Sequence, residues 1–449
     1  MKIIDIKTNE FYTMKAYKIN NVQINYYSFK DDFKIITYNH NTSRVEARLT
    51  YNIGSRNNAF YDQIEQKNLK FENGLAHLLE HVLFFDEEQR DISNWFLNKG
   101  ANTNAYTSTR NTTYCFECFS DSYDNDQELL KVAFECVDKL YDMTERIRIS
   151  EEKLVDEIGI IQREISETKD EDEKLDKVLD AIAGLKNHPC SINICGVSEE
   201  IQKFGYEDII EYFNTTYNPN MTTLTINNTF YFDDEKILEL YKTVLLKYKK
   251  DDMQTFEPIF LSDNNSIRKA INPMMELSNG AYRNSGLIVR IESPEDTKSC
   301  YKAIIANGLF QVLFFSLHDL SYSKLIEKYH DLPISISSST EIGYVTYKLK
   351  YHTSMSADVY SDLSKFIKNR LDNVGKYLLS DIKFFEKIKK LFLKEFIATL
   401  EQEPGIFING FLDNGYEDLK EYFDILIKFS KEDFIEYFTN IRFEINGIR

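Results

Sequence analysis

The spacing of apolar residues along the first half of the chain predicts strands and helices in a regular succession. Alternation of apolar and polar residues predicts strands within 15–60, at 102–120 and at 221–230. Apolar residues recurring every three or four positions predict helices at about 73–87, 91–99, 126–142, 151–183 and 207–216. The polar stretch 247–258 contains a proline and is typical of a linker.

The same order of elements returns after this linker. We expect a strand at 286–293, helices at 297–315 and 322–329, strands at 334–340 and 344–352, and helical segments from 357 to the end. The sequence therefore predicts an α+β protein with two similar domains, 1–246 and 259–449, joined by 247–258. Each domain is expected to hold a mostly antiparallel sheet packed with helices.

Composition agrees with two packed domains and excludes several classes of protein. A chain of 449 residues with 43% apolar residues is long enough for two cores and too apolar to be disordered. No apolar run approaches the ~18 residues that a membrane span needs. The net charge of −18 argues against nucleic acid and against an anionic membrane as partners. Without a signal peptide in its first residues, the chain is expected to be cytoplasmic.

The six cysteines show no disulfide framework, but two of them form a C-x-x-C pattern. Cys115 and Cys118 lie in the stretch TTYCFECFS, whose bulky residues predict a strand. Residues three apart in a strand face opposite sides of the sheet, so one metal ion could hardly bind both. We therefore expect these two cysteines to have a structural role.

Candidate chemistry is concentrated in the stretch GLAHLLEHVLFF at 74–85. On a helix, His77 and His81 project from nearly one stripe, and Glu80 lies beside it. Two imidazoles on one face form half of a zinc site, and the carboxylate can act as general base: this is the inverted H-x-x-E-H pattern. The alternative is a buried helix with two hydrogen-bonded histidines, since leucine and valine surround the motif.

A third protein ligand has to come from another element. The predicted helix DEIGIIQREISE at 156–167 carries Glu157 and Glu164, which are seven residues apart and face the same side. Spacing alone does not choose between them, and a glutamate on an amphipathic helix is usually a surface residue.

Six ordered stretches of the chain resemble one known family. They are NIGSRNN (52–58), NGLAHLLEHVLFF (73–85), KGANTNAYTSTRNTTY (99–114), GIIQREISE (159–167), NHPCSINICGVSEEI (187–201) and EDIIEYFNTTYNPNMTTLTI (207–226). Residues 44 to about 230 thus resemble the pitrilysin/insulinase superfamily of zinc metallopeptidases with the inverted motif. Within it, the chain is most similar to the short, two-domain branch that includes processing peptidases.

This resemblance implies a set of roles for individual residues. His77, His81 and Glu164 would bind Zn²⁺, Glu80 would be the general base, and Glu157 would assist catalysis by orienting the ligands. The substrate peptide would be held as an added strand along Asn104, Ala105 and Tyr106, with the Asn104 side chain reaching the substrate backbone. The implied activity is that of a zinc endopeptidase that cleaves unfolded peptides, such as precursor or leader peptides.

The chain departs from the family in its second half. Relatives carry an arginine and a tyrosine near the substrate carbonyl, and Ile326 and Ile334 stand at the matching positions here. Alkyl groups cannot stabilise an oxyanion. Either Lys328 or Tyr329 substitutes, or a second subunit supplies the pair, and we expect the second: a heterodimer of two peptidase-like chains. The alternative to an enzyme is a non-catalytic subunit that binds peptides or has a structural role.

Overall fold

The computed structural model describes most of the chain. The described residues are 2–39, 44–167, 175–176, 179, 194–227, 232–250, 256–258, 284–292, 297–315, 319–329, 334–341, 344–352, 356–379, 382–413 and 419–448. They form two compact units. Unit 1 comprises Met1–Glu167, Ile192–Leu261 and Thr399–Glu417, and unit 2 comprises Thr168–Ser191, Ser262–Ala398 and Asp418–Arg449. The domain boundary at 247–258 stays a prediction.

Unit 1 is built on an eight-stranded sheet with the order β1-β2-β3-β4-β10-β5-β9-β8. Only β4 and β10 pair in parallel; the other neighbours are antiparallel. The strands are β1 (Lys2–Thr8), β2 (Tyr12–Ile19), β3 (Val22–Phe29), β4 (Lys34–Tyr38), β5 (Arg44–Tyr51), β8 (Ala101–Thr107), β9 (Thr112–Phe119) and β10 (Thr222–Asn227). A smaller sheet has the order β11 (Phe256–Pro258), β6 (Ala59–Asp62), β7 (Lys67–Lys70).

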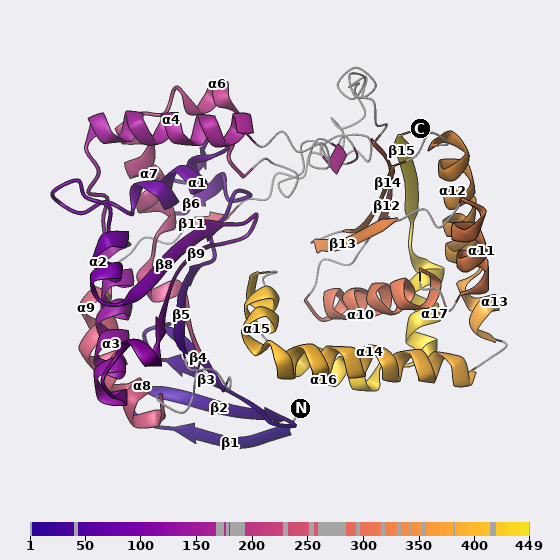
Figure 1. Ribbon diagram of the computed structural model, residues 1–449, viewed down its shortest axis with the longest axis horizontal. Coiled ribbons are helices and arrows are strands. Elements are labelled where there is room, and N and C mark those ends of the chain that lie inside the picture. The colour runs from indigo at the N-terminus through magenta and orange to yellow at the C-terminus, as the bar shows by residue number, and fades with distance from the viewer. Residues whose placement is uncertain are drawn as a thin grey trace. The chain divides into compact units, whose positions relative to one another are not determined.

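The helices of unit 1 supply the other layer of its core. They are α1 (Leu75–Val82), α2 (Ser93–Asn98), α3 (Asp126–Met143), α4 (Glu151–Glu167), α6 (Ser198–Ile201), α7 (Tyr206–Thr216), α8 (Asp234–Leu240), α9 (Leu246–Tyr248) and α15 (Pro404–Asp413), with the 3₁₀-helices η1 (Ser120–Ser122) and η3 (Pro219–Met221) and the π-helix η4 (Tyr241–Leu245). Helix α3 begins where the Asn125 side chain accepts hydrogen bonds from two backbone amides of the first turn. It packs along β5 and β9 (Figure 1).

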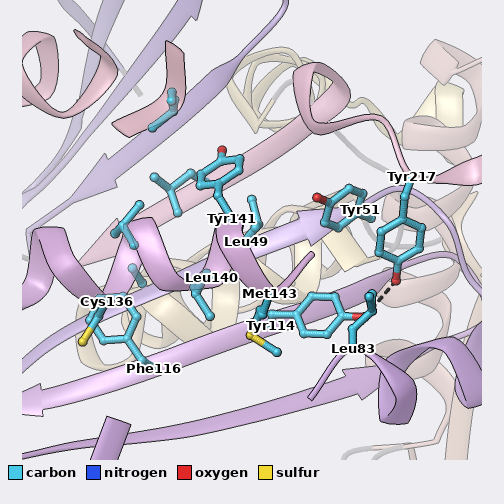
Figure 2. Packing of buried hydrophobic residues seen from close by; sticks show 14 of the residues in the cluster. Leu49, Tyr51, Leu83, Tyr114, Phe116, Cys136, Leu140, Tyr141, Met143 and Tyr217 are labelled. Carbon is cyan, nitrogen blue, oxygen red and sulfur yellow. Dashed lines mark hydrogen bonds between the residues drawn. The ribbon is translucent and has the colours of Figure 1, made fainter. Parts of the chain in front are cut away.

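The core between sheet and helices is rich in tyrosine. Figure 2 shows Leu140 and Tyr141 of α3 packed near Leu49, Tyr51 and Phe116 of the sheet. The buried hydroxyls of Tyr114 and Tyr217 are 2.9 Å apart and hydrogen-bond to each other. Large aromatic rings thus fill the interior while their polar ends remain satisfied, as buried hydroxyl groups require.

Unit 2 holds a smaller antiparallel sheet with the order β13-β14-β12-β15. Its strands are β12 (Asn284–Glu292), β13 (Ser335–Glu341), β14 (Tyr344–His352) and β15 (Phe443–Ile448). Its helices are α10 (Thr297–Phe314), α11 (Leu320–Lys328), α12 (Ser356–Asp372), α13 (Val374–Leu379), α14 (Ile382–Gln402), α16 (Leu419–Lys428) and α17 (Lys431–Asn440). Helix α12 packs against β12 and β15. No helix in the described part of the chain is long and apolar enough to cross a membrane.

The α+β fold class predicted from the sequence is confirmed, with particular corrections. The sequence predicts helical segments from 357 to the end, but Phe443–Ile448 is a strand that pairs with β12. Helix α4 matches the first part of the helix predicted at 151–183; most of 168–183 lies outside the described residues. Cys115 and Cys118 do face opposite sides of β9: Cys118 is in the core, while Cys115 donates to the Asn104 carbonyl on the other face.

Substitution of Gly54 tests how tightly one loop of unit 1 is packed. A Cβ atom at Gly54 would lie only 2.5–2.6 Å from backbone atoms of Ser108, Arg110 and Asn111. Since backbone cannot rotate away, we expect Gly54→Ala to destabilise the protein by about 1–3 kcal/mol in chemical denaturation. Gly159→Ala is the matched control: nothing lies within 4 Å of its Cβ position on helix α4, so it should be neutral or slightly stabilising. Equal effects of the two changes would contradict this account.

Candidate metal centre

Helix α1 places both histidines of the motif on the side that its apolar residues leave open. Its buried residues are Leu75, Ala76, Leu78, Leu79, Glu80 and Val82. The half-buried rings of His77 and His81 lie edge to face, with centroids 4.8 Å apart. This follows from their spacing of four residues, which is slightly more than one helical turn. The helix contacts α4, α7, β8 and β9, so its orientation is fixed on several sides.

Helix α4 brings its two glutamates to different nitrogens of this pair. Glu164 Oε2 is 3.8 Å from His77 Nε2 and 3.9 Å from His81 Nε2. Glu157 Oε2 is 3.2 Å from His81 Nδ1 and hydrogen-bonds to it. Glu157 is 8% exposed, whereas the Glu164 side chain is 42% exposed. The geometry therefore distinguishes the two residues: Glu164 faces the Nε2 atoms of both imidazoles, whereas Glu157 hydrogen-bonds to the other ring nitrogen, Nδ1, of His81.

Burial and neighbouring charges give the two histidines different proton affinities. Burial lowers the pKa of His77 to about 4, with a further contribution from His81. Burial also lowers the pKa of His81, but the hydrogen bond with Glu157 and the charges of Glu80, Glu164 and Glu157 outweigh it and leave that pKa raised. His77 is thus neutral at pH 7, the form in which imidazole binds a metal.

Glu80 is buried on the same helix and is held by a strand residue. It is 8% exposed, and Thr107 Oγ1, at the end of β8, donates a 2.6 Å hydrogen bond to Glu80 Oε2. Burial raises the pKa of Glu80, and the Thr107 hydrogen bond works in the opposite direction. A carboxylate that lies beside two imidazoles, and whose own pKa is raised, has the properties of a general base. Thr107 was not singled out from the sequence, because its contact with α1 depends on tertiary structure.

Removal of the Thr107 hydroxyl should change the pH profile of any reaction that uses Glu80 as a base. Thr107→Val deletes the hydrogen bond that lowers the pKa of Glu80, so that pKa should rise and the acid limb of kcat/KM should move to higher pH. Thr103→Val is a matched control on the same strand, since Thr103 Oγ1 donates to the Cys115 carbonyl instead. An acid limb that stays in place in both variants would contradict the role assigned to Thr107.

The donor types of His77, His81 and Glu164 suit a zinc ion, but among the described residues the three whose ligand atoms lie within 4.8 Å of one another are His77, Glu164 and Cys195. Two imidazoles and one carboxylate are the protein ligands of one well-known kind of catalytic zinc site. Around a tetrahedral ion with bonds of ~2.0–2.1 Å, ligand atoms lie roughly 3.4 Å apart, so both imidazoles are within a few tenths of an ångström of that separation from Glu164. His77 Nδ1 is buried and has no hydrogen-bond partner among the described residues.

A cysteine lies at this centre as well. His77, Glu164 and Cys195 each offer one ligand atom, and these three atoms lie within 4.8 Å of one another; His81 is not a member of this trio. Cys195 belongs to one of the sequence blocks used for the family resemblance, but it carries no signal of its own. It stands 31 positions after Glu164 in the chain, and only the fold shows that it approaches His77.

The residues expected to bind a substrate lie on a sheet edge beside this centre. Asn104, Ala105 and Tyr106 belong to β8, which pairs with β9 on one side and is the last strand of the eight-stranded sheet. Helix α1 contacts β8. Asn104 is exposed, and the Tyr106 hydroxyl accepts a 3.4 Å hydrogen bond from Arg48. The outer edge of a terminal strand can bind an extended peptide through backbone hydrogen bonds. The role of these three residues in binding stays a prediction.

Unit 2 contains the two positions at which the sequence is expected to depart from the family. Ile326 lies on α11 and Ile334 just before β13, and both are half-buried. The two candidate substitutes are bound elsewhere: the Tyr329 hydroxyl donates a 2.8 Å hydrogen bond to Asp362, and Lys328 Nζ is 2.5 Å from the same carboxylate. Each side chain would have to abandon Asp362 before it could act on a substrate.

Comparisons with known proteins found related sequences for the first part of the chain. Residues 34–194 match the profile of the family described as Insulinase (Peptidase family M16). The chain is 30% identical over 197 residues to the mitochondrial-processing peptidase subunit beta of Caenorhabditis elegans, covering 43% of this chain and 38% of that protein. It is 28% identical over 185 residues to the uncharacterized zinc protease YmfH of Bacillus subtilis, covering 41% of this chain and 40% of that one. These matches thus span about two fifths of the relatives' length.

Solved structures extend the likeness to nearly the whole chain. A putative M16-like peptidase from Alicyclobacillus acidocaldarius superposes with a TM-score of 0.77 at 18% identity, covering 96% of this chain and 99% of that one. The periplasmic protease PqqL of Escherichia coli gives a TM-score of 0.68 at 14% identity, and the match covers 96% of this chain and 48% of that one. The fold is therefore that of the M16-like peptidases. Residues 34–194 are therefore similar in sequence to the insulinase family of peptidases, as the sequence blocks predicted.

Proposed function

We propose that this chain is the zinc-binding subunit of an endopeptidase that cleaves unfolded peptides, such as precursor or leader peptides. His77, His81 and Glu164 are the metal ligands. The observation that carries the proposal is the position of Glu164 Oε2, 3.8 and 3.9 Å from the Nε2 atoms of two histidines that one helix turn separates. All four residues of the metal and base set are present, which favours an enzyme over a non-catalytic subunit. The predicted cytoplasmic location is part of the proposal.

Each residue of the centre then has a task in peptide hydrolysis. A Zn²⁺ ion at this position supplies Lewis-acid chemistry. Glu80 accepts a proton from the attacking water and donates it to the leaving amine. Thr107 holds the Glu80 carboxylate in place. Glu157 fixes the ring of His81 through Nδ1, so that Nε2 keeps its direction; such outer carboxylates commonly orient metal-binding imidazoles.

The substrate is held by its backbone along the outer edge of β8, at Asn104, Ala105 and Tyr106. Backbone hydrogen bonds are made by any extended sequence, so this mode of binding selects unfolded segments and tolerates variation in their side chains. Support comes from the position of β8, which is the last strand of its sheet and contacts α1. A folded protein has few unpaired strands that could bind in this way, so we expect it to be a poor substrate.

The proposal includes a second peptidase-like subunit, which completes the site with an arginine and a tyrosine. Support comes from Ile326 and Ile334 at the matching positions and from Asp362, which binds both nearby polar candidates. The PqqL chain, about half of which is covered by this fold, gives an example of a longer chain that includes it. The partner's chemistry is therefore defined: a chain of similar fold that carries the pair and need not carry zinc ligands.

Zinc binding is the first test. The purified chain should retain about one Zn²⁺ per molecule after dialysis, and Glu164→Gln should lose it, because an amide is a much weaker ligand than a carboxylate. Glu152→Gln, an exposed change in the first turn of the same helix, should retain it. Glu157→Gln should weaken binding by ~10–100-fold, as loss of an orienting partner does. Failure of the unmodified chain to bind zinc would overturn the proposed function.

A further inference from the structure

A cysteine thiol stands at the metal centre in addition to the expected ligands. The ligand atoms of His77, Glu164 and Cys195 lie within 4.8 Å of one another, and Cys195 is half-buried. Two members of this trio are residues that the metal centre already requires. Cys195 therefore shares its immediate surroundings with the metal, although it belongs to neither helix α1 nor helix α4.

Two glycines hold the backbone of Cys195 against the beginning of helix α1. Gly74, which precedes the helix, has φ +99°, and a Cβ there would lie 3.0 Å from the Cys195 carbonyl oxygen. Gly196 has φ +75°, and a Cβ there would lie 2.5 Å from the Asn73 carbonyl oxygen. Glycine is needed at both positions, because of the left-handed backbone and because of the close approach. The contact keeps the backbone of Cys195 close to the helical turn that carries His77. Rotation about χ1 of Cys195 then sets the position of its sulfur.

We propose that Cys195 is an additional ligand of the metal in the peptide-free protein. This inference rests on the proposed metal site. On binding, the thiol releases its proton to solvent and the thiolate sulfur takes a coordination position, with a Zn–S distance of ~2.3 Å. Together with His77, His81 and Glu164 it makes four protein ligands. Zinc sites with four protein ligands are closed, whereas hydrolysis needs an open position.

The peptide-free protein would then have a closed metal site, which must open before hydrolysis can occur. Cys195 must leave the metal before water can take its coordination position. We expect this exchange to occur when a peptide binds along β8, next to the centre. Because the ligand is a thiolate, the closed state protects Cys195 from thiol-modifying reagents, which act on thiolates that are exposed and uncoordinated. The metal shell of this chain is thus expected to differ from one made of imidazole and carboxylate alone.

Cobalt substitution gives a direct readout that does not depend on activity. The full-length chain loaded with Co²⁺ alone should show the intense near-ultraviolet band of sulfur-to-cobalt charge transfer. Cys195→Ser should lose this band while still binding about one Co²⁺ per chain. Cys115→Ser is the matched control and should keep the band, since Cys115 is also half-buried but donates to the Asn104 carbonyl on the sheet.

A second measurement uses only the unmodified chain and so does not require the variant to fold. Zn²⁺ should slow alkylation of Cys195 by iodoacetamide at least ~10-fold relative to the metal-free protein, because a coordinated thiolate is a poor nucleophile, while Cys115 should react at the same rate in both. Tandem mass spectrometry of the tryptic peptides reports each site, because fragmentation separates Cys195 from Cys190 in peptide 187–203 and Cys115 from Cys118 in peptide 111–131.

The outcomes separate this inference from the proposed function. Stoichiometric Co²⁺ without the charge-transfer band, or equal alkylation of Cys195 with and without Zn²⁺, would overturn the role of Cys195 and leave the metal site standing. A band that persists in Cys195→Ser would also overturn it. Failure of the unmodified chain to bind either ion would remove the metal site and the inference together.

Discussion

Glu80→Gln should abolish peptide hydrolysis and leave zinc in place. Glutamine has nearly the shape of glutamate but cannot accept a proton, so the attacking water keeps its proton and the leaving amine receives none. Loss of general acid–base catalysis alone is worth ~10²–10⁴-fold, and here one residue performs both transfers. The Thr107 hydroxyl can still donate to the side-chain oxygen of the substituted residue, so the local fold should survive.

The measurement compares turnover of an unfolded peptide with zinc content in the same samples. Glu88→Gln serves as the control, since Glu88 follows the same helix but is exposed and pairs with Arg90. It should change neither quantity. Full zinc content with turnover within about tenfold of the unmodified protein would show that Glu80 is not the base. Loss of zinc in Glu80→Gln would instead assign the residue to the metal, contrary to its hydrogen bond with Thr107.

The sequence predicts the part of the site that depends on local geometry. His77, Glu80 and His81 lie within one short stretch, and the periodicity of a helix is enough to put both imidazoles on one stripe. Glu164 is different. Spacing alone leaves Glu157 and Glu164 equivalent, and the family resemblance is needed to choose. In the fold, the two glutamates face different nitrogens of the histidines, a distinction that depends on how α4 crosses α1.

Contacts between distant segments explain what the sequence did not predict. Thr107 and Cys195 approach the centre only because β8 and the turn before α6 meet helix α1. Strand β15 was missed for a related reason: it is short, follows a long helical region, and pairs with β12, so that Arg290 lies opposite Glu444. Strand pairing between such distant residues leaves little trace in local periodicity. The α+β class, by contrast, follows from the repeated succession of strands and helices and is confirmed.

The chain alone should hydrolyse peptides at least ~10²-fold more slowly than the complex with its partner. The expected reason is the missing oxyanion stabiliser, whose removal from other enzymes costs ~10²–10³-fold. The partner to test is a chain of similar fold that lacks H-x-x-E-H and carries the arginine–tyrosine pair. Zinc-dependent turnover of one peptide is measured for the chain, for the partner and for an equimolar mixture, with light scattering to establish the oligomeric state of each.

Two variants of the chain decide whether it can supply the missing groups itself. Tyr329→Phe and Lys328→Gln should leave turnover of the complex within about twofold, because both side chains are held by Asp362 in unit 2. Hydrogen bonds to a carboxylate are stronger than those between neutral groups, and either side chain would have to give one up to act at the substrate. Robust turnover by a verified monomer, lost in either variant, would place the oxyanion stabiliser within this chain and remove the need for a partner.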